Sequence, residues 1–214
     1  MEFYVYGSIT RGELDQNSDV DILCLIDESE DVNGRVPLNF SIYSKGRIKQ
    51  HYEHGTLFAW HLYRDSRLIF PIEGGFLKKI GSPKEYSSSY EDLGLLNELL
   101  RKAIANIQDS QINLIYELGL VYVSVRNIAT IASWFLPEGL CCSRYVPYYI
   151  KEIGFPLKKE DYEVLIACRH ATTRGRKVQL DKVLHVSKYL NLLAQWANSV
   201  TKEITNAKQF LKQS

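Results

Sequence analysis

Residues 5–26 read VYGSITRGELDQNSDVDILCLI, and this stretch decides both the fold and the chemistry expected of the chain. It begins as a short apolar strand that ends at Gly7 and Ser8, continues as a polar turn, and enters a second apolar strand through Asp19 and Asp21. Because successive side chains of a strand point to opposite faces, the two acids are expected to lie on one face. Two carboxylates at the entrance of a buried strand repel each other unless a cation lies between them.

The acidic pair and the Gly-Ser pair together predict a site for a divalent metal and a phosphate. Carboxylate oxygens at this spacing suit Mg²⁺ (or Mn²⁺), which takes few protein ligands and completes its shell with water and substrate phosphates. Gly7 removes the side chain where a phosphate has to approach the backbone. Ser8 can then offer its hydroxyl and its N–H group to that phosphate, at the start of a helical turn. The alternative is a surface turn with two solvated acids, and the apolar flanks argue against it.

The segment GSITRG followed by SDVD resembles the signature of the DNA polymerase beta-like nucleotidyltransferase superfamily: Gly-Ser, a second Gly, and Asp-x-Asp inside an apolar strand. The resemblance covers roughly the first third of the chain. It implies that Asp19 and Asp21 are catalytic and bind the metal. It also implies a nucleotide-binding set, which here is Gly7, Ser8, Arg11 and Ser18. Arg11 would contact the leaving pyrophosphate, and a solvated turn residue is an equal alternative for it.

The superfamily pattern has a third carboxylate on the following strand, and the matching residue here is Asn39. That carboxylate helps bind a metal and can act as base toward the acceptor, whereas an amide oxygen cannot take a proton in that role. Glu117 is a candidate base from elsewhere, because aminoglycoside-modifying relatives take a base from their helical domain; a buried or edge residue paired with an Arg is the favoured alternative for it. Asp27 and Glu28 are further candidates, with a solvated turn as the favoured alternative.

Composition limits the class of protein. The chain has 214 residues, of which 45% are hydrophobic and 24% charged, as in an ordinary globular protein with a substantial core. A net charge of +1 predicts no general affinity for nucleic acid or an anionic membrane, so such binding would need a local patch. Four cysteines without a Cys-x-x-Cys pair are expected to be reduced thiols of a cytoplasmic protein. Charged residues interrupt the apolar stretch 112–136, so we expect a buried helix there and no membrane span.

The first part of the chain predicts a small mixed sheet with helices on one side. The turn signal Asn33-Gly34 predicts that the third strand is antiparallel to the second. Strands are expected at 3–6, 20–26, 36–43 and 68–72. Helices are expected at 45–53, 55–67 and 76–80.

The second part is expected to be helical throughout. Segment 81–89, with Gly, Pro and a Ser run, is the predicted linker between a domain at 1–80 and a domain at 90–214. Helices are expected along the apolar stripe 93–107 and at 112–135, 145–153, 161–172 and 181–204, the last opened by Asp181 as a cap. The predicted fold class is therefore α+β, a small mixed nucleotidyltransferase sheet domain followed by an all-α helical bundle. This layout resembles that of aminoglycoside nucleotidyltransferases and of minimal nucleotidyltransferases paired with helical partners.

Two functional hypotheses follow. The leading one is a Mg²⁺-dependent nucleotidyltransferase that moves a nucleoside monophosphate, with AMP from ATP as first choice, onto an RNA, a protein or a small molecule. The alternative, which Asn39 favours, is a catalytically degenerate nucleotide-binding regulatory protein of an antitoxin or antiphage-defence system. A nucleoside triphosphate is the expected ligand, and a partner protein or a homo-oligomer stays open. One local basic patch suits either a phosphate or RNA contact or a structural role at a helix end: Arg169, His170, Arg174, Arg176 and Lys177.

Overall fold

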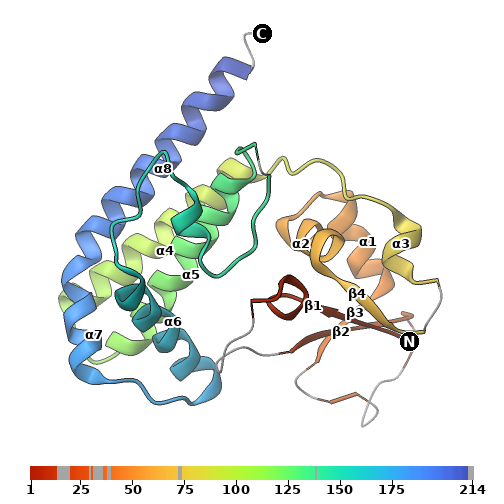
Figure 1. The fold of residues 1–214 in the computed structure, drawn as a ribbon, viewed down its shortest axis with the longest axis horizontal. Helices are drawn as coiled ribbons and strands as arrows, with labels where there is room; N and C mark the ends of the chain where they lie inside the picture. The colour runs from red at the N-terminus through yellow and green to blue at the C-terminus, as the bar shows by residue number, and fades with distance from the viewer. Residues whose placement is uncertain are drawn as a thin grey trace. The chain divides into compact units, whose positions relative to one another are not determined.

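The computed structural model describes residues 1–13, 20–28, 30, 36–37, 40–71, 74–137 and 139–211, with the backbone alone for 207–211. The chain divides into two compact units, Met1–Ser88 and Ser89–Ser214. The first unit contains a four-stranded sheet with short helices, and the second is helical (Figure 1). The α+β fold class predicted from the sequence is confirmed. Segment 81–89 remains our proposed linker.

The sheet has the strand order β3-β2-β1-β4. Its centre is an antiparallel pair, β1 (Glu2–Tyr6) and β2 (Asp21–Ile26), in which Tyr6 lies opposite Asp21. Strand β4 (Arg67–Phe70) adds to β1 in antiparallel orientation, and β3 (Ser41–Ser44) adds to β2. The end of β1 and the start of β2 therefore meet at one edge of the sheet.

The expectation that the third strand runs antiparallel to the second is wrong. Strand β3 is parallel to β2, with Ser41 opposite Leu23, and it is shorter than the predicted 36–43. A hairpin joins its strands by a loop of about two to five residues. Here residues 27–40 connect β2 to β3, a length that suits the crossover a parallel neighbour requires. The turn signal Asn33-Gly34 lies outside the described residues.

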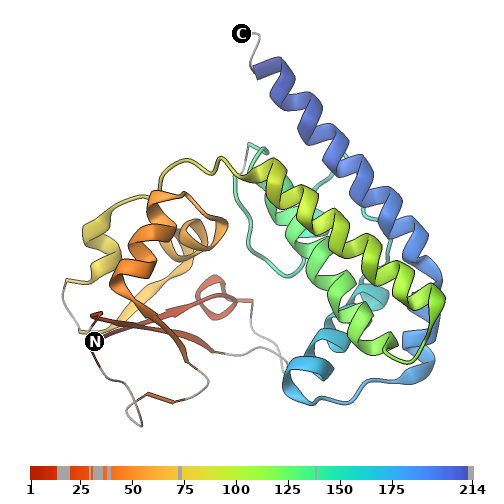
Figure 2. The same cartoon turned by 180° about the vertical axis from the view of Figure 1, so that it is seen from behind.

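Three helices cover one face of the sheet: α1 (Lys45–Glu53), α2 (Leu57–Asp65) and α3 (Phe76–Ile80) (Figure 2). The first two begin at side-chain caps, because the Ser44 hydroxyl accepts from the N–H of Arg47 and the Thr56 hydroxyl accepts from the N–H of Ala59. Their apolar sides join the sheet in one buried core, made of Tyr4, Leu23, Leu25, Ile48, Tyr52, Ala59, Leu62 and Leu77.

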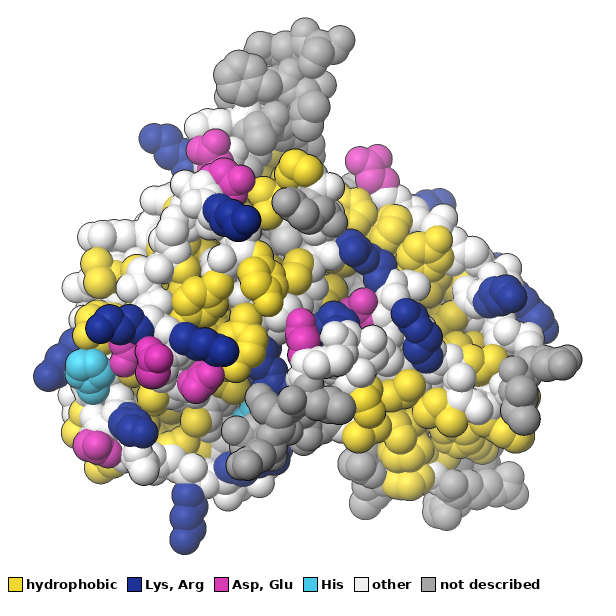
Figure 3. Space-filling model, viewed as in Figure 1, with side chains coloured by type: hydrophobic (Ala, Val, Ile, Leu, Met, Phe, Trp, Pro, Cys, Tyr) yellow, Lys and Arg dark blue, Asp and Glu magenta, His cyan; other side chains and the backbone are white. Residues whose placement is uncertain are grey.

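The other face of the sheet carries an apolar row that crosses all four strands. The register places Phe3 opposite both Cys24 and Phe70, and Cys24 opposite Ile42. Ile42 and Phe70 are 38% and 57% exposed. Figure 3 shows hydrophobic side chains gathered on the surface of the first unit.

The helical unit is built around α5 (Leu114–Ser133). This helix packs against α4 (Ser89–Asp109), α6 (Lys159–Arg174) and α8 (Leu190–Leu211). It is long and apolar enough to cross a membrane, but 61% of its most apolar window is buried inside the protein. Burial of this kind is typical of the core helix of a bundle, as the sequence predicted.

Two helix predictions in this unit are wrong. The expected helix 181–204 is two helices, because α7 (Leu180–Val186) ends at a 3-10 turn, Ser187–Tyr189, before α8 begins. Asp181 lies in the first turn of α7 and is not its cap, which is Gln179. The expected helix 145–153 is a single 3-10 turn, Val146–Tyr149, with a proline near its start.

Candidate functional site

The candidate site begins where Gly7 meets Asp21. Gly7 follows β1 with a φ of 82°, a left-handed conformation that favours glycine. A Cβ atom at Gly7 would lie 2.5 Å from Oδ2 of Asp21, so the backbone and the carboxylate touch where a side chain would stand. Asp21 is exposed at the entrance of β2. The Gly-Ser pair and one predicted acid are thus brought together, as the sequence indicated.

Ser8 begins a tight 3-10 turn, Ile9–Arg11, and is buried itself. The Ser8 carbonyl accepts hydrogen bonds from the N–H groups of Arg11 at 3.3 Å and Glu13 at 2.9 Å. The Thr10 hydroxyl donates to the Gly7 carbonyl at 2.8 Å. In a trans peptide the N–H group points away from the carbonyl, so the N–H of Ser8 is directed away from Thr10. The turn can therefore offer an N–H group to an anion.

Tyr6 lies beside the carboxylate of Asp21. Its hydroxyl shares a hydrogen bond of 3.1 Å with the hydroxyl of Ser41, the first residue of β3. Burial raises the pKa of Tyr6, the Ser41 hydrogen bond partly opposes this shift, and the negative charge of Asp21 raises the pKa further. The phenol therefore stays neutral, and three strands supply polar groups to this edge of the sheet.

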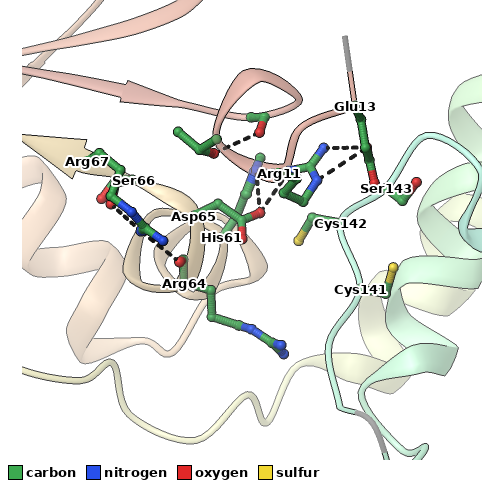
Figure 4. A network of polar contacts seen from close by, with 12 residues as sticks. Arg11, Glu13, His61, Arg64, Asp65, Ser66, Arg67, Cys141, Cys142 and Ser143 are labelled. Carbon is green, nitrogen blue, oxygen red and sulfur yellow. Dashed lines mark hydrogen bonds and ion pairs between the residues drawn. The ribbon is translucent and has the colours of Figure 1, made fainter.

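Arg11 ties the turn to helix α2 (Figure 4). Its guanidinium forms ion pairs with Asp65 at 2.8 Å and with Glu13 at 3.2 Å. His61 lies one helical turn before Asp65. Its Nε2 atom is 3.3 Å from Oδ2 of Asp65 and 3.3 Å from Nη1 of Arg11. The described contacts of Arg11 are those of a residue that positions the turn, whereas its predicted contact with a leaving group stays a proposal.

The charges of this network stabilise one another. Burial opposes ionisation of Asp65, but hydrogen bonds from His61 and Arg11 outweigh it and hold the pKa of Asp65 below its usual value. Burial likewise opposes the charge of Arg11, and the hydrogen bonds to Glu13 and Asp65 raise the pKa of its guanidinium. The Arg11–Asp65 pair is therefore ionised on both sides at neutral pH.

Ser18, Asp19 and Asn39 lie outside the described residues, so their assignments stay predictions. The candidate bases Asp27 and Glu28 lie within the described residues. Asp27 follows the far end of β2 from Asp21 and pairs with Lys45 at 3.1 Å. Six residues of strand span about 20 Å at roughly 3.3 Å per residue. Asp27 is therefore too far from Asp21 to act as a base in the same site.

Glu117 lies in the first turn of α5, in the second unit, and is 6% exposed. Its Oε1 accepts a hydrogen bond of 3.0 Å from the Asn106 amide, and its Oε2 has no hydrogen-bond partner among the described residues. The described partner of Glu117 is thus an amide on α4 and not the arginine that the sequence favoured.

The predicted basic patch belongs to the end of α6 and the turn after it. Arg169 and Arg174 lie on α6, which ends at Gly175 in the left-handed conformation. Burial raises the pKa of Tyr122 on α5, and the positive charges of Arg126, Arg144, Arg169 and Arg174 partly offset this shift. Four guanidinium groups therefore act on one phenol, a wider basic cluster than the sequence indicated.

Two of the residues that hold Arg11 in place were not predicted from the sequence. His61 and Asp65 stand four residues apart on α2, a spacing that places side chains on one helix face. This spacing could have been noticed in the sequence. Nothing local, however, links it to a turn fifty residues earlier.

A family model supports the resemblance for residues 1–80. Residues 1–80 match the family model described as "Nucleotidyltransferase domain". Among solved structures the chain is similar to the crystal structure of spectinomycin adenyltransferase AAD(9) from Enterococcus faecialis with ATP and spectinomycin; the identity is 12%, the TM-score 0.48, and the match covers 92% of this chain and 91% of that chain. No curated protein sequence matches this chain. The predicted superfamily resemblance is confirmed for residues 1–80.

Proposed function

We propose that the nucleotidyltransferase domain formed by residues 1–80 transfers a nucleoside monophosphate, AMP from ATP, onto an RNA, a protein or a small molecule. The observation that carries the proposal is the approach of the Asp21 carboxylate to the backbone of Gly7. A metal ligand and a phosphate-binding turn have to be neighbours in such a site, because the metal and the phosphate bind each other. A surface turn with a solvated acid would not require glycine at this place.

The donor set fits a hard divalent cation. Asp21 presents carboxylate oxygen at the strand entrance, and we assign Asp19 as the second ligand of Mg²⁺ or Mn²⁺. A divalent cation bound there would offset the negative charge of the triphosphate. We place no other cofactor in the site.

The chain's own residues bind and orient the nucleotide. We assign the β and γ phosphates to the Ser8 N–H and hydroxyl and to the open space at Gly7, with Ser18 as a further contact. In the reaction an acceptor oxygen forms a bond to the α-phosphorus while the bond from that phosphorus to the pyrophosphate oxygen breaks. Arg11, fixed by Asp65 and Glu13, keeps the turn in place and lends positive charge on the leaving side.

The test is calorimetry of ATP binding with and without Mg²⁺, comparing wild type with the Asp19→Ala/Asp21→Ala double variant. We expect metal-dependent binding to be lost while circular dichroism shows an unchanged fold. Unchanged ATP affinity in the double variant would make the site assignment wrong. Incubation with labelled ATP, GTP, CTP and UTP and a cell lysate then identifies the nucleotide and the class of acceptor.

A second candidate function is a catalytically degenerate, nucleotide-binding regulatory protein of an antitoxin or antiphage-defence system. Asn39 favours it, because an amide stands where the superfamily pattern has a carboxylate. This candidate predicts ATP binding without transfer of label to any acceptor. The labelling experiment therefore separates the two functions.

A further inference from the structure

The first unit contains a cavity of about 450 Å³ that the proposed transfer reaction does not use. It is lined by residues from two strands and three helices. The strands contribute Tyr4 of β1 and Leu68 of β4, and the helices contribute Tyr52 of α1, Tyr63 of α2, and Leu77 and Lys78 of α3. These elements are seen together in Figure 2. The volume lies within the range of small-molecule sites, and the lining of aromatic and aliphatic side chains is typical of them.

Two tyrosines that line the cavity differ in the hydrogen bonding of their hydroxyls. The hydroxyl of Tyr4 donates to Glu2 at 2.7 Å and accepts from the N–H of Leu77 at 3.2 Å. Tyr52 is 4% exposed, and its hydroxyl has no hydrogen-bond partner among the described residues. Buried phenols normally find a partner. A buried donor without a described partner, on a residue that lines the cavity, therefore points to a ligand that accepts a hydrogen bond.

Burial keeps Tyr52 in its donor form. It raises the pKa of the Tyr52 phenol, and the nearby Tyr63 phenol raises it further, so the hydroxyl keeps its proton at neutral pH. A protonated phenol can donate to an anionic acceptor, and such a charge-assisted hydrogen bond is among the stronger ones.

The charged group that lines the cavity is positive. Lys78 is the one charged side chain among the described residues that line it. The carboxylate of Glu2 lies behind the Tyr4 hydroxyl and is compensated by Lys45 at 3.6 Å. The cavity therefore favours a negative ligand, whose charged end belongs with Lys78 and Tyr52.

Gly75 packs closely against one wall of the cavity. Its φ is 96°, and a Cβ atom there would lie 3.0 Å from the Tyr4 hydroxyl oxygen and 3.1 Å from a methyl carbon of Leu68. A side chain at this position would have to push against two lining residues. Glycine at this position therefore lets the chain pack closely against two residues of the cavity wall.

We propose that this cavity binds a small planar aromatic carboxylate, with its ring against the tyrosine and leucine side chains and its carboxylate toward Lys78 and Tyr52. The aromatic and aliphatic walls favour a flat apolar body. One ammonium group and one hydroxyl without a described partner match a singly charged group and are too few for a diphosphate or triphosphate.

Three probes with one ring system test the charge: 2-naphthoate, 2-naphthamide and 2-naphthylmethylammonium, titrated into the full chain with calorimetric or fluorescence detection. We expect the carboxylate to bind about tenfold or more tightly than the other two. Lys78→Ala should remove this preference, whereas Lys79→Ala, an exposed lysine next along the same helix that does not line the cavity, should keep it. Tyr52→Phe should weaken binding of the carboxylate about tenfold.

The experiment also separates the cavity from the nucleotide site. Saturating ATP with Mg²⁺ should leave the affinity for 2-naphthoate unchanged. Displacement by ATP, equal binding of the three probes, absence of binding at millimolar concentration, or wild-type affinity in both Lys78→Ala and Tyr52→Phe would each overturn the proposal. If Tyr52→Phe does not fold, the exposed pair Lys78 and Lys79 carries the test alone.

Discussion

Arg11 and Glu117 are two largely buried charges that the chain treats in opposite ways. The side chain of Arg11 is 19% exposed and has Glu13, Asp65 and His61 as partners. Glu117 is 6% exposed, and among the described residues one of its oxygens has an amide partner while the other has none. A buried charge is stable only when it is paired and hydrogen-bonded. The Arg11 network therefore stabilises the fold, whereas the burial of Glu117 with one oxygen unpaired among the described residues lowers the free energy of unfolding.

The difference in hydrogen bonding between Arg11 and Glu117 indicates which of the two is the better candidate for a catalytic role. The Arg11 network joins the turn after β1 to α2, so its charges have a structural role in holding the proposed phosphate-binding turn in place. A half-satisfied buried carboxylate has no such structural account. An unsatisfied buried group in a folded protein calls for an explanation, and a catalytic role is one such explanation.

The largest effect is expected when a charge is added to the proposed site. In the superfamily pattern a carboxylate occupies the position of Asn39, so Asn39→Asp should supply a metal ligand and a base. A missing general base costs roughly a hundredfold or more, so transfer of label from ATP should rise by about that factor. Asn39→Ser, which adds no charge, is the control. A neutral or harmful effect of the aspartate would mean that the base lies elsewhere.

The next effect concerns the first residue of the turn. Gly7→Ala would place a methyl group against the Asp21 carboxylate, and we expect transfer to fall by about a hundredfold, as a misplacement near 1 Å can cause. Gly12→Ala is the matched control, because Gly12 also has a positive φ, of 71°, but nothing within 4 Å of its Cβ position. If both variants lose activity equally, backbone strain and not the contact with Asp21 is responsible.

A third variant breaks the satisfied network. Arg11→Ala leaves Asp65 buried with one partner fewer, and we expect a loss of about 2–3 kcal/mol in the free energy of unfolding at pH 7. Urea denaturation followed by circular dichroism measures it. Adding Asp65→Asn should recover part of the loss, because the unpaired charge is gone. Additive losses in the double variant would show that the pair is not coupled.

The same network gives a pH dependence with a defined sign. The pKa of Asp65 is lower in the folded protein than its ordinary value of 3.8. Its contribution to stability is therefore fully present above pH 3.8 and is lost as the pH falls through the folded pKa. Asp65→Asn should lack this acid-induced loss, and urea titrations at pH 7 and at stepwise lower pH compare the two proteins.

Some parts of this molecule could be predicted from its sequence and others could not. The strands β1 and β2 and the helix α1 follow from apolar runs and a cap that are visible locally. The direction of β3 depends on how residues 27–40 return to the sheet, which no local pattern decides. Two partners of Arg11, His61 and Asp65, come from a helix more than forty residues later, so only the folded chain brings them together.

The smallest effect is expected at Glu117, and it decides what the unsatisfied carboxylate is for. Glu117→Gln keeps the oxygen that accepts from Asn106 and removes the buried charge, so we expect the free energy of unfolding to stay within about 1 kcal/mol of wild type or to rise. Asn106→Leu is the opposing variant, since it leaves both oxygens of Glu117 without the amide and should cost about 1–3 kcal/mol. If Glu117→Gln folds like wild type and still loses transfer of label by a hundredfold, Glu117 is the base that Asn39 cannot be. If transfer is unchanged, the negative charge of Glu117 serves neither the fold nor the reaction, and the base has to be sought in the residues around the acidic pair.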